Sequence, residues 1–489
     1  MRTRCPDPPH GSPVPIFDLP RSRSRAELCV QLRPHRNSIS ISHTHNRFAI
    51  VRTRVRSGFT ATRPPGARFS GSVDAMPQLA AVTGSAHRRI ELGPVLVAGH
   101  RVTLRTTRLS DFHPWHAIRL RDRELIEPFW TTSALSWTQR HSRAWWIREY
   151  LRQRRAHAAG RALRLSVFVD GDFAGQCTLS PIDRRNHAAE LGIWLDSERA
   201  RHGLGTVAGA LATDYAFGTL GLHRITAPVC VGNRPARQAS IRGGMSLEAT
   251  MIRAMSVGGQ VRDHELWAVT ADKAPTGGYV TALIASGVAT ERVSAVRASP
   301  RERLTTGWRT VRMAAPGTVL VVSARYYLGT PLRRGVRTGM PLPDALYTHD
   351  TGNHPVSLRK HQSRLHSRRG PRVRYEVTAA GQPLGNLILD TVGEHPRLTL
   401  ELTPDPAQTK SAATGLALLL DYAHDELHLD RIEARLDPDA THLPAIAEAA
   451  GLRREGVLTG ARIGPDGRFH NVELWAAIPE KPSRTSAPG

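Results

Sequence analysis

Cysteine is scarce in this sequence, since Cys5, Cys29, Cys177 and Cys230 are the four that occur among 489 residues. Their spacing matches no metal-binding or redox motif, so they point neither to a metal site nor to a disulfide framework. Four scattered thiols fit a reducing compartment. We therefore expect a cytoplasmic protein that binds no metal.

Long apolar runs are also missing. A membrane-spanning helix needs about 20 consecutive apolar residues. The best run in this chain, near residues 318–322, is no longer than a short strand. We therefore expect no interaction with a membrane.

Acidic residues are few, with 42 Asp and Glu against 67 Lys and Arg, and nearly all the cations are arginine. One reading is a GC-rich genome, because alanine, glycine and proline are abundant as well. The other reading is a partner rich in negative charge, which leaves ribosome, RNA and phosphorylated ligands open. The length allows two to four domains.

Residues 1–75 differ from the rest of the chain. They contain thirteen arginines and four acidic residues, many Pro and Ser, and no sustained periodicity, which predicts disorder. Three origins remain open: a basic arm for nucleic acid, an arginine-rich organelle-targeting peptide, or upstream sequence translated because the start site was assigned too early. Met76 and a domain-like lead-in over residues 76–96 favour the last.

The most informative stretch runs from Glu190 to Asn233 and reads as strand, turn, helix and strand. In the turn, Gly203 and Gly205 allow close backbone approach, so N–H groups at the start of the helix can point at one anion. A dinucleotide fold would need a third glycine and an acidic residue after the second strand. That strand ends in Val231, Gly232 and Asn233, which excludes such a fold.

These residues resemble the GNAT superfamily of N-acetyltransferases, and within it the RimJ/RimL-like branch of ribosomal-protein-alanine N-acetyltransferases. The resemblance covers about residues 97–270. The matching pieces are AELGIWLD (189–196), GLG (203–205), LGLHRITA (220–227), Asn233, Leu247, Glu248 and DHELWA (263–268). The resemblance implies an α+β fold, the acyl-CoA N-acyltransferase fold, with a mixed and mostly antiparallel sheet flanked by helices.

The pattern of the chain agrees with such a layout. Its expected order is strand, two helices, three strands, helix, strand, helix and hairpin. Asp-Gly at 170–171, between two alternating apolar runs, predicts the first hairpin. In the second helix Trp146 and Tyr150 share one face, and we expect them to be core residues. The predicted elements are strands 100–107, 163–169, 173–182, 189–195, 223–231 and 263–269, with helices 111–121 and around 145–151.

The resemblance also implies a site for acetyl-CoA as co-substrate. The pyrophosphate would lie on the turn formed by Arg201, His202, Gly203, Leu204, Gly205 and Thr206. The pantetheine arm would pair like an added strand with the backbone of Ile193, Trp194 and Leu195, and Asn233 would hold it from the other side. A backbone N–H near residues 193–195 is the expected donor to the negative charge that develops on the thioester oxygen.

The catalytic groups follow less directly. Glu190 is the candidate base, acting directly or through a water, and the alternative is a glutamate that faces solvent. No tyrosine occurs between Tyr215 and Tyr279, so Ser240 or a water would replace the tyrosine acid that many acetyltransferases use. Phe129 and Trp130 would line the acceptor pocket, or else pack under their loop.

Two departures from the family pattern weaken the match. Ala200 stands where the family usually has Gln or Arg, although Arg199 and Arg201 flank it. Ala236 stands where the family often has serine. These losses favour a second class of function, a non-catalytic basic protein that binds RNA or the ribosome.

An internal repeat links the two halves of the chain. The segment DYAFGTLGLHRITA from Asp214 returns as DYAHDELHLDRIEA from Asp421, with eight of fourteen positions identical. We therefore predict a tandem arrangement: a catalytic domain at 97–272, a linker at 273–306, a second copy at 307–479 and a tail at 480–489. The second copy has Lys410 and Ala412 at the glycine positions of the first, which predicts a degenerate site and a structural role, such as replacing the partner subunit of a dimer.

The predicted function is transfer of acetyl from acetyl-CoA to a primary amine. The expected acceptor is the N-terminal α-amine of a protein, with a ribosomal protein and an association with the ribosome as the family's typical case. A small amine, either an aminoglycoside or a polyamine, is the alternative acceptor.

Overall fold

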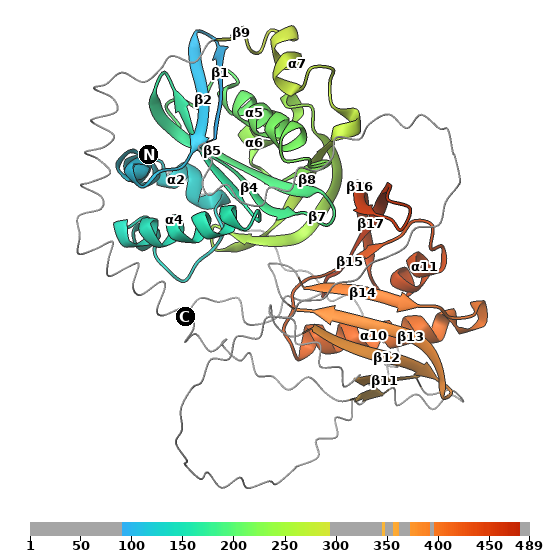
Figure 1. Cartoon of the computed structure of the whole chain (residues 1–489). Helices are drawn as coiled ribbons and strands as arrows, with labels where there is room; N and C mark the ends of the chain where they lie inside the picture. The colour runs from blue at the N-terminus through green and yellow to red at the C-terminus, as the bar shows by residue number, and fades with distance from the viewer. Residues whose placement is uncertain (1–89, 294–344, 348–355, 361–371, 392–395, 480–489) are drawn as a thin grey trace, which may run out of the picture.

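The computed structural model describes residues 90–293, 345–347, 356–360, 372–391 and 396–479. The predictions for residues 1–75 and for the tail at 480–489 lie outside these residues. The described residues form two units, called here the first unit (90–293) and the second unit (345–479), each with a sheet and helices (Figure 1).

The first unit contains nearly all the elements expected from the sequence. Its helices are α1 (Phe112–Arg121), α2 (Arg123–Ile126), α3 (Trp137–Arg140), α4 (Arg143–Ala158), α5 (Leu204–Gly218), α6 (Arg234–Arg242) and α7 (Tyr279–Ala285). Its strands are β1 (Glu91–Val97), β2 (His100–Thr106), β3 (Leu163–Val169), β4 (Asp172–Asp183), β5 (Ala188–Leu195), β6 (Arg224–Cys230), β7 (Ser246–Val257), β8 (Gln260–Thr270) and β9 (Glu291–Arg292).

Local sequence signals explain several of these elements. Helix α4 begins after Ser142, whose hydroxyl accepts a hydrogen bond from the Trp145 N–H. The β3–β4 turn uses Asp170 and Gly171, both with positive φ, which confirms the predicted hairpin. Trp146 is buried in the core as predicted, whereas Tyr150 is only partly buried.

The sheet of the first unit has the order β9-β1-β2-β3-β4-β5-β6-β8-β7. Every neighbouring pair is antiparallel except β5 and β6, which are parallel and pair only from Ala188 to Glu190. Helix α5 packs its apolar residues on one face of the sheet, and the aromatic residues of α1 and α4 cover the other. The predicted mixed, mostly antiparallel sheet flanked by helices is therefore confirmed.

The predicted linker at 273–306 needs a correction. Helix α7 and strand β9 lie within it, and β9 pairs with β1 at Arg292 and Val95. Tyr279, Val280 and Leu283 of α7 are buried in the same core as α5. The first unit therefore extends to at least residue 292, because this apolar helix covers surface that a linker would leave exposed.

The second unit repeats the order of the first unit from β3 onward. Its elements are β10 (Ala345–Tyr347), β11 (Val356–Lys360), β12 (Arg372–Ala379), β13 (Gln382–Asp390), β14 (Arg397–Leu402), α10 (Thr409–Asp425), β15 (Ile432–Leu436), α11 (His442–Ala449), β16 (Arg453–Ile463) and β17 (Phe469–Ala477). Its sheet order is β10-β11-β12-β13-β14-β15-β17-β16, and β14 with β15 is its parallel pair.

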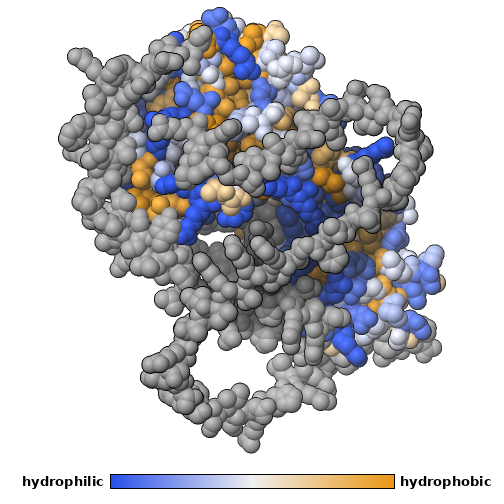
Figure 2. Space-filling view, in the orientation of Figure 1, coloured by the Kyte–Doolittle hydropathy of each residue, from blue (hydrophilic) through white to orange (hydrophobic). Residues whose placement is uncertain are grey.

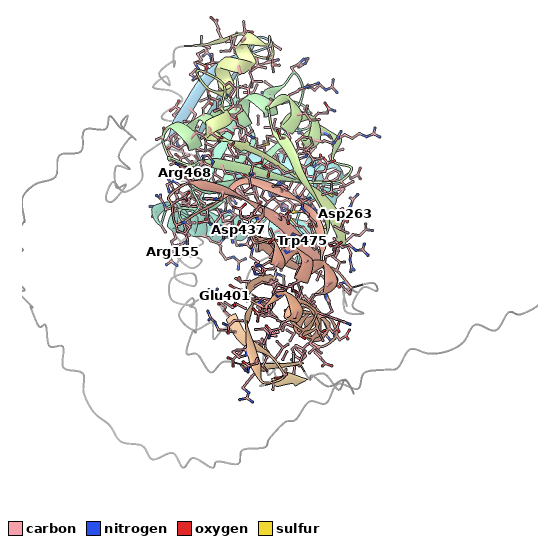
Figure 3. The ribbon with its side chains drawn as sticks, turned by 90° about the vertical axis from the view of Figure 1, so that its right-hand side faces the viewer. Arg155, Asp263, Glu401, Asp437, Arg468 and Trp475 are labelled. Carbon is pink, nitrogen blue, oxygen red and sulfur yellow. The ribbon has the colours of Figure 1, made fainter. Side chains whose placement is uncertain are left out.

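The two sheets meet where β7 of the first unit pairs with β16 of the second, at Ala249 and Gly456. Apolar residues of β7, β8, β16 and β17 form a small shared core at this junction, which includes Met251, Leu266 and Leu474. Figure 3 shows β16 and β17, with Asp437 and Trp475 labelled nearby, between the first unit and the rest of the second unit. The two units are therefore joined by packed and paired structure as well as by the chain.

The polar contacts at the junction occur in two equivalent sets. Arg224 donates to the carboxylate of Glu248 and to the carbonyl oxygen of Thr459 (2.6 Å). Arg431 donates to the carboxylate of Glu455 (2.6 Å) and to the carbonyl oxygen of Ile252 (2.8 Å). The N–H of Thr459 donates to Glu248 (3.0 Å), and the N–H of Ile252 donates to Glu455 (2.9 Å).

An offset of 207 positions relates each residue of one set to its counterpart in the other. The same offset relates Ala249 to Gly456, which pair with each other. Reciprocal contacts of this kind are what a two-fold axis through the junction produces.

Candidate active site

The separation of β5 from β6 creates the first feature of the candidate site. Beyond Glu190, strand β5 stays paired with β4, where Cys177, Gln176 and Gly175 face Ile193, Trp194 and Leu195. Its pairing with β6 stops at Glu190. An extended ligand can therefore lie between the strands and bond to the backbone of residues 193–195, as an added strand does.

The turn after β5 supplies the second feature. His202 and Gly203 have positive φ values of 57° and 82°, and Gly203 is the N-cap of α5 without any side-chain cap. The N–H groups of a helix's first turn have no acceptor within the helix. The Leu204 N–H donates to the carbonyl oxygen of Arg201 (3.2 Å), but no side chain among the described residues caps the helix. The other N–H groups of its first turn, at the positive end of the helix dipole, suit an anion.

Both predicted glycines of this turn lie in tight places. A Cβ on Gly203 would lie 3.0 Å from a methyl group of Val288, and one on Gly205 would lie 3.3 Å from a methyl group of Leu195. The turn thus packs against the end of β5 and against the segment after α7. A larger side chain at 203 would press against Val288, and one at 205 would press against Leu195 of β5.

The cations near the turn differ in their availability. Arg201 and His202 are exposed at the mouth of the turn. Arg199 donates to the carboxylate of Asp172 (3.0 Å) and to the carbonyl oxygen of Val169 (3.3 Å). Arg201 is therefore better placed than Arg199 to provide the charge that Ala200 lacks.

Strand β5 presents different residues to its two faces. Ile193 and Leu195 point toward α5, because Cβ atoms built on Gly209 and Gly205 would contact them. Trp194 lies on the other face with Phe173, and its indole N–H donates to Gln176 (3.3 Å). Glu190 shares the face of Trp194 by strand alternation and lies where β5 and β6 separate.

The two predicted residues of α6 also have roles within the helix. The side chain of Asn233 caps α6 by accepting from the Ala236 N–H (3.3 Å). The Ser240 hydroxyl is buried and donates to the Ala236 carbonyl (3.1 Å). Capping of α6 accounts for an asparagine at position 233 without any contact to a cofactor. The role of Ser240 as an acid remains a prediction.

The loop of Phe129 and Trp130 is fastened to the tip of the β7–β8 hairpin. Thr131 forms a bridge with Val257, and the Gly258 N–H donates to the Trp130 carbonyl (3.0 Å). Both aromatic side chains are partly exposed, and neither belongs to a buried core cluster. The loop is therefore fixed to this hairpin, and its role as a wall of the acceptor pocket remains a prediction.

Arg119 is a residue of the site that sequence reasoning missed. Its guanidinium lies 3.7 Å from the ring centre of Trp130, 4.8 Å from that of Trp194 and 5.0 Å from that of Trp137. Its Nε–H donates to Nε2 of His141 (3.0 Å), and its side chain is 1% exposed. The one available signal was its position four residues after the buried Trp115 in a predicted helix, which places it on the apolar face.

The corresponding turn of the second unit is built differently. There the short 3₁₀ helix Pro406–Gln408 leads into α10, and Asp405 forms a capping box with Gln408. Lys410 stands at the position of Gly203, the N-cap of α5 in the first unit. Ala412, at the position of Gly205, is fully buried.

Within the described residues, no group of three or more His, Cys, Asp or Glu is arranged to hold a metal ion. No helix in the same residues is long and apolar enough to cross a membrane. On the face shown in Figure 2, hydrophilic and apolar patches alternate over the described residues.

The part of the chain that carries this site is similar to known proteins. Residues 101–246 match the family model of the acetyltransferase (GNAT) domain. YdaF of Bacillus subtilis (strain 168), provisionally named a ribosomal N-acetyltransferase, is 30% identical over 110 residues, or 22% of this chain and 60% of that protein. Spermidine N(1)-acetyltransferase of Escherichia coli (strain K12) is 32% identical over 100 residues, or 20% of this chain and 54% of that protein.

A solved structure is similar over a longer part of the chain. RimJ of Mycobacterium smegmatis in complex with CoA-disulfide is 33% identical and covers 41% of this chain and 96% of its own, with a TM-score of 0.40. By contrast, this chain spans between 54% and 60% of the two curated relatives it matches.

Proposed function

We propose, from the match of residues 101–246 to the acetyltransferase (GNAT) domain, that this protein transfers acetyl from acetyl-CoA to a primary amine. The observation that carries the proposal is the uncapped start of α5 beside the point where β5 leaves β6. The match supplies the reaction class, and these two features supply places for a phosphate group and for an extended chain.

In this proposal the pyrophosphate of acetyl-CoA binds to the turn of residues 203–206, with Arg201 and His202 beside it. The pantetheine arm pairs with the backbone of Ile193, Trp194 and Leu195. Asn233, at the start of α6, lies on the opposite side of the arm. The residues present fit the cofactor, because the helix start is uncapped and the strand edge beyond Glu190 has left β6.

The chemistry requires a neutral amine at the thioester carbonyl. Glu190 takes a proton from the acceptor ammonium, directly or through a water, and the amine then forms a bond to the carbonyl carbon. A backbone N–H near residues 193–195 donates to the oxygen as it becomes negative. The carbon–sulfur bond breaks, and the nitrogen loses its second proton, which Ser240 or a water relays to the departing thiolate.

For the acceptor, we propose the N-terminal α-amine of a protein, and of a ribosomal protein in particular. The name of the Bacillus subtilis relative supports this choice, and that of the Escherichia coli relative supports a polyamine as the alternative. The buried guanidinium of Arg119 beside Trp130 disfavours a polyamine, because like charges repel in a dry site.

We propose that the second unit is a degenerate copy of the first and replaces the partner subunit of a dimer. The repeated strand order and the reciprocal contacts of Arg224 and Arg431 support this role. With Lys410 and Ala412 at the positions of Gly203 and Gly205, the second unit is not expected to bind acetyl-CoA.

Calorimetric titration of acetyl-CoA into the full-length chain tests the proposal. We expect one site per chain, abolished by Gly203→Glu and retained in Lys410→Glu, which makes the matched change in the second unit. Glu190→Gln should lower turnover at neutral pH and leave acetyl-CoA affinity unchanged. Absence of binding in the wild type contradicts the enzymatic proposal, and two sites per chain contradict a degenerate second unit.

A further inference from the structure

Arg119 is a buried charge to which the proposed reaction assigns no role. Its side chain is 1% exposed, and its Nη1 atom is buried without a hydrogen-bond partner. Its Nε–H bonds to a histidine, and among the described residues no carboxylate forms an ion pair with it. A buried guanidinium normally has an anionic partner, since removal from water is costly for an unpaired ion.

The surroundings do not neutralise this charge. Burial, together with the positive charges of Arg140 and Arg164, lowers the pKa of Arg119 to about 9, so the group is still a cation at neutral pH. Burial, with the charge of Arg119 adding to it, lowers the pKa of His141 to about 3, so the imidazole is neutral. Three indole rings face the guanidinium and offset part of the cost through cation–π attraction.

The location of Arg119 connects it to the acceptor side of the site. Trp130, on the proposed acceptor wall, lies against one side of its guanidinium, and Trp194 of β5 lies nearby. Trp194 and the proposed base Glu190 are four residues apart on one face of the strand. At ~3.3 Å per residue, the distance between them along the strand is about 13 Å. An extended peptide advances about 3.5 Å per residue, so its first four residues cover this distance.

We propose that Arg119 is a specificity-determining residue that binds a side-chain carboxylate within the first four residues of the acceptor peptide. The inference rests on the proposed function, since it concerns the acceptor of that same site. Trp130 covers the guanidinium in the structure and is only partly buried, while hydrogen bonds hold its backbone at the N–H and at the carbonyl. Rotation of its side chain, without movement of the loop, uncovers one side of the guanidinium, and a carboxylate then replaces the indole as the partner of the charge.

The experiment compares amidated peptides that start with alanine and carry Glu or Gln at position two, three or four. With the full-length chain and acetyl-CoA, we expect kcat/KM to be at least about tenfold higher for Glu than for Gln at one of these positions. Arg119→Gln should abolish the preference, and Arg119→Lys should reduce it, because a lysine lacks the two-pronged geometry. Arg123→Gln, an exposed arginine on α2, should retain it.

Equal kcat/KM for Glu and Gln at all three positions in the wild type overturns the role of Arg119, while the acetyltransferase proposal stands. Acetyl-CoA binding without turnover of any peptide overturns the peptide acceptor, and the inference with it. If Arg119→Gln fails to fold, as judged by circular dichroism, the wild-type comparison and the reduced preference in Arg119→Lys decide the question.

Discussion

The junction between the two units leads to a quantitative prediction about Arg224. Its side chain is 3% exposed, and it donates to Glu248, 8% exposed, and to the carbonyl of Thr459. In Arg224→Met the buried carboxylate of Glu248 keeps the hydrogen bond from the Thr459 N–H and loses the guanidinium of Arg224. Removing one partner of a buried ion pair typically costs about 3–5 kcal/mol. We expect the free energy of unfolding to fall by about 3 kcal/mol, since the remaining hydrogen bond keeps part of the stabilisation.

The two-fold relation extends this prediction to Arg431, which is buried with Glu455 and makes the reciprocal contact to Ile252. Arg431→Met should cost a similar amount. Urea unfolding followed by tryptophan fluorescence measures both changes. Arg237→Met is the matched control, because its ion pair with Glu265 is half exposed and should contribute less than about 1 kcal/mol.

The double variant Arg224→Met with Glu248→Leu separates the lost charge from the lost volume. Replacing both partners of a buried pair by apolar residues is often close to neutral, so most of the lost stability should return. A change below about 1 kcal/mol for Arg224→Met, or no recovery in the double variant, would refute this account of the junction.

Two further predictions concern the first unit. A Cβ on Gly175 would clash with the carbonyl oxygen of Trp194 and lie 2.9 Å from the Leu195 Cα. Gly175→Ala should therefore lower the melting temperature by several degrees and weaken acetyl-CoA binding. Gly218→Ala is the control and should do neither, because the space around Gly218 is open. The pKa of His141 is 6.5 in the unfolded chain and about 3 in the folded protein, so its contribution to stability is complete above pH 6.5 and is lost as pH falls toward 3. Thermal melts between pH 8 and pH 4 should show this loss of stability. The loss should be smaller in His141→Asn.

The elements around the turn at residues 201–206 could be predicted from the sequence because each has a strong local signal. Alternation defines β5 and β6, and the glycines at 203 and 205 define the turn. Asp170 and Gly171 likewise define a hairpin that needs no distant contact. These local preferences agree with the final fold, so the prediction and the structure coincide there.

Helix α7 was missed for the opposite reason. It has seven residues and follows a segment with Pro275, Gly277 and Gly278, which reads as a loop. Its N-terminus is set by a distant residue, since the carboxylate of Asp214 accepts from the N–H groups of Tyr279 and Val280. A tertiary contact over 65 positions leaves no local pattern.

Arg119 could not be found by residue type, because arginine is normally a surface residue. Its surroundings come from α3, β5 and the loop of Trp130, three segments that only the fold brings together. The junction contacts were equally hidden, although the internal repeat predicted that a second unit would exist to make them.

The pairing of Ala249 with Gly456 has a consequence for how such a chain can evolve. A Cβ on Gly456 would clash with the carbonyl oxygen of Glu248 and lie 2.7 Å from the Ala249 Cβ. In an assembly of identical subunits, one codon would set both residues at this point, and an alanine would meet an alanine. Because one polypeptide encodes the two sides separately, each can take the residue that the other requires. The first unit, if excised, should therefore fail to rebuild this seam with a second copy of itself.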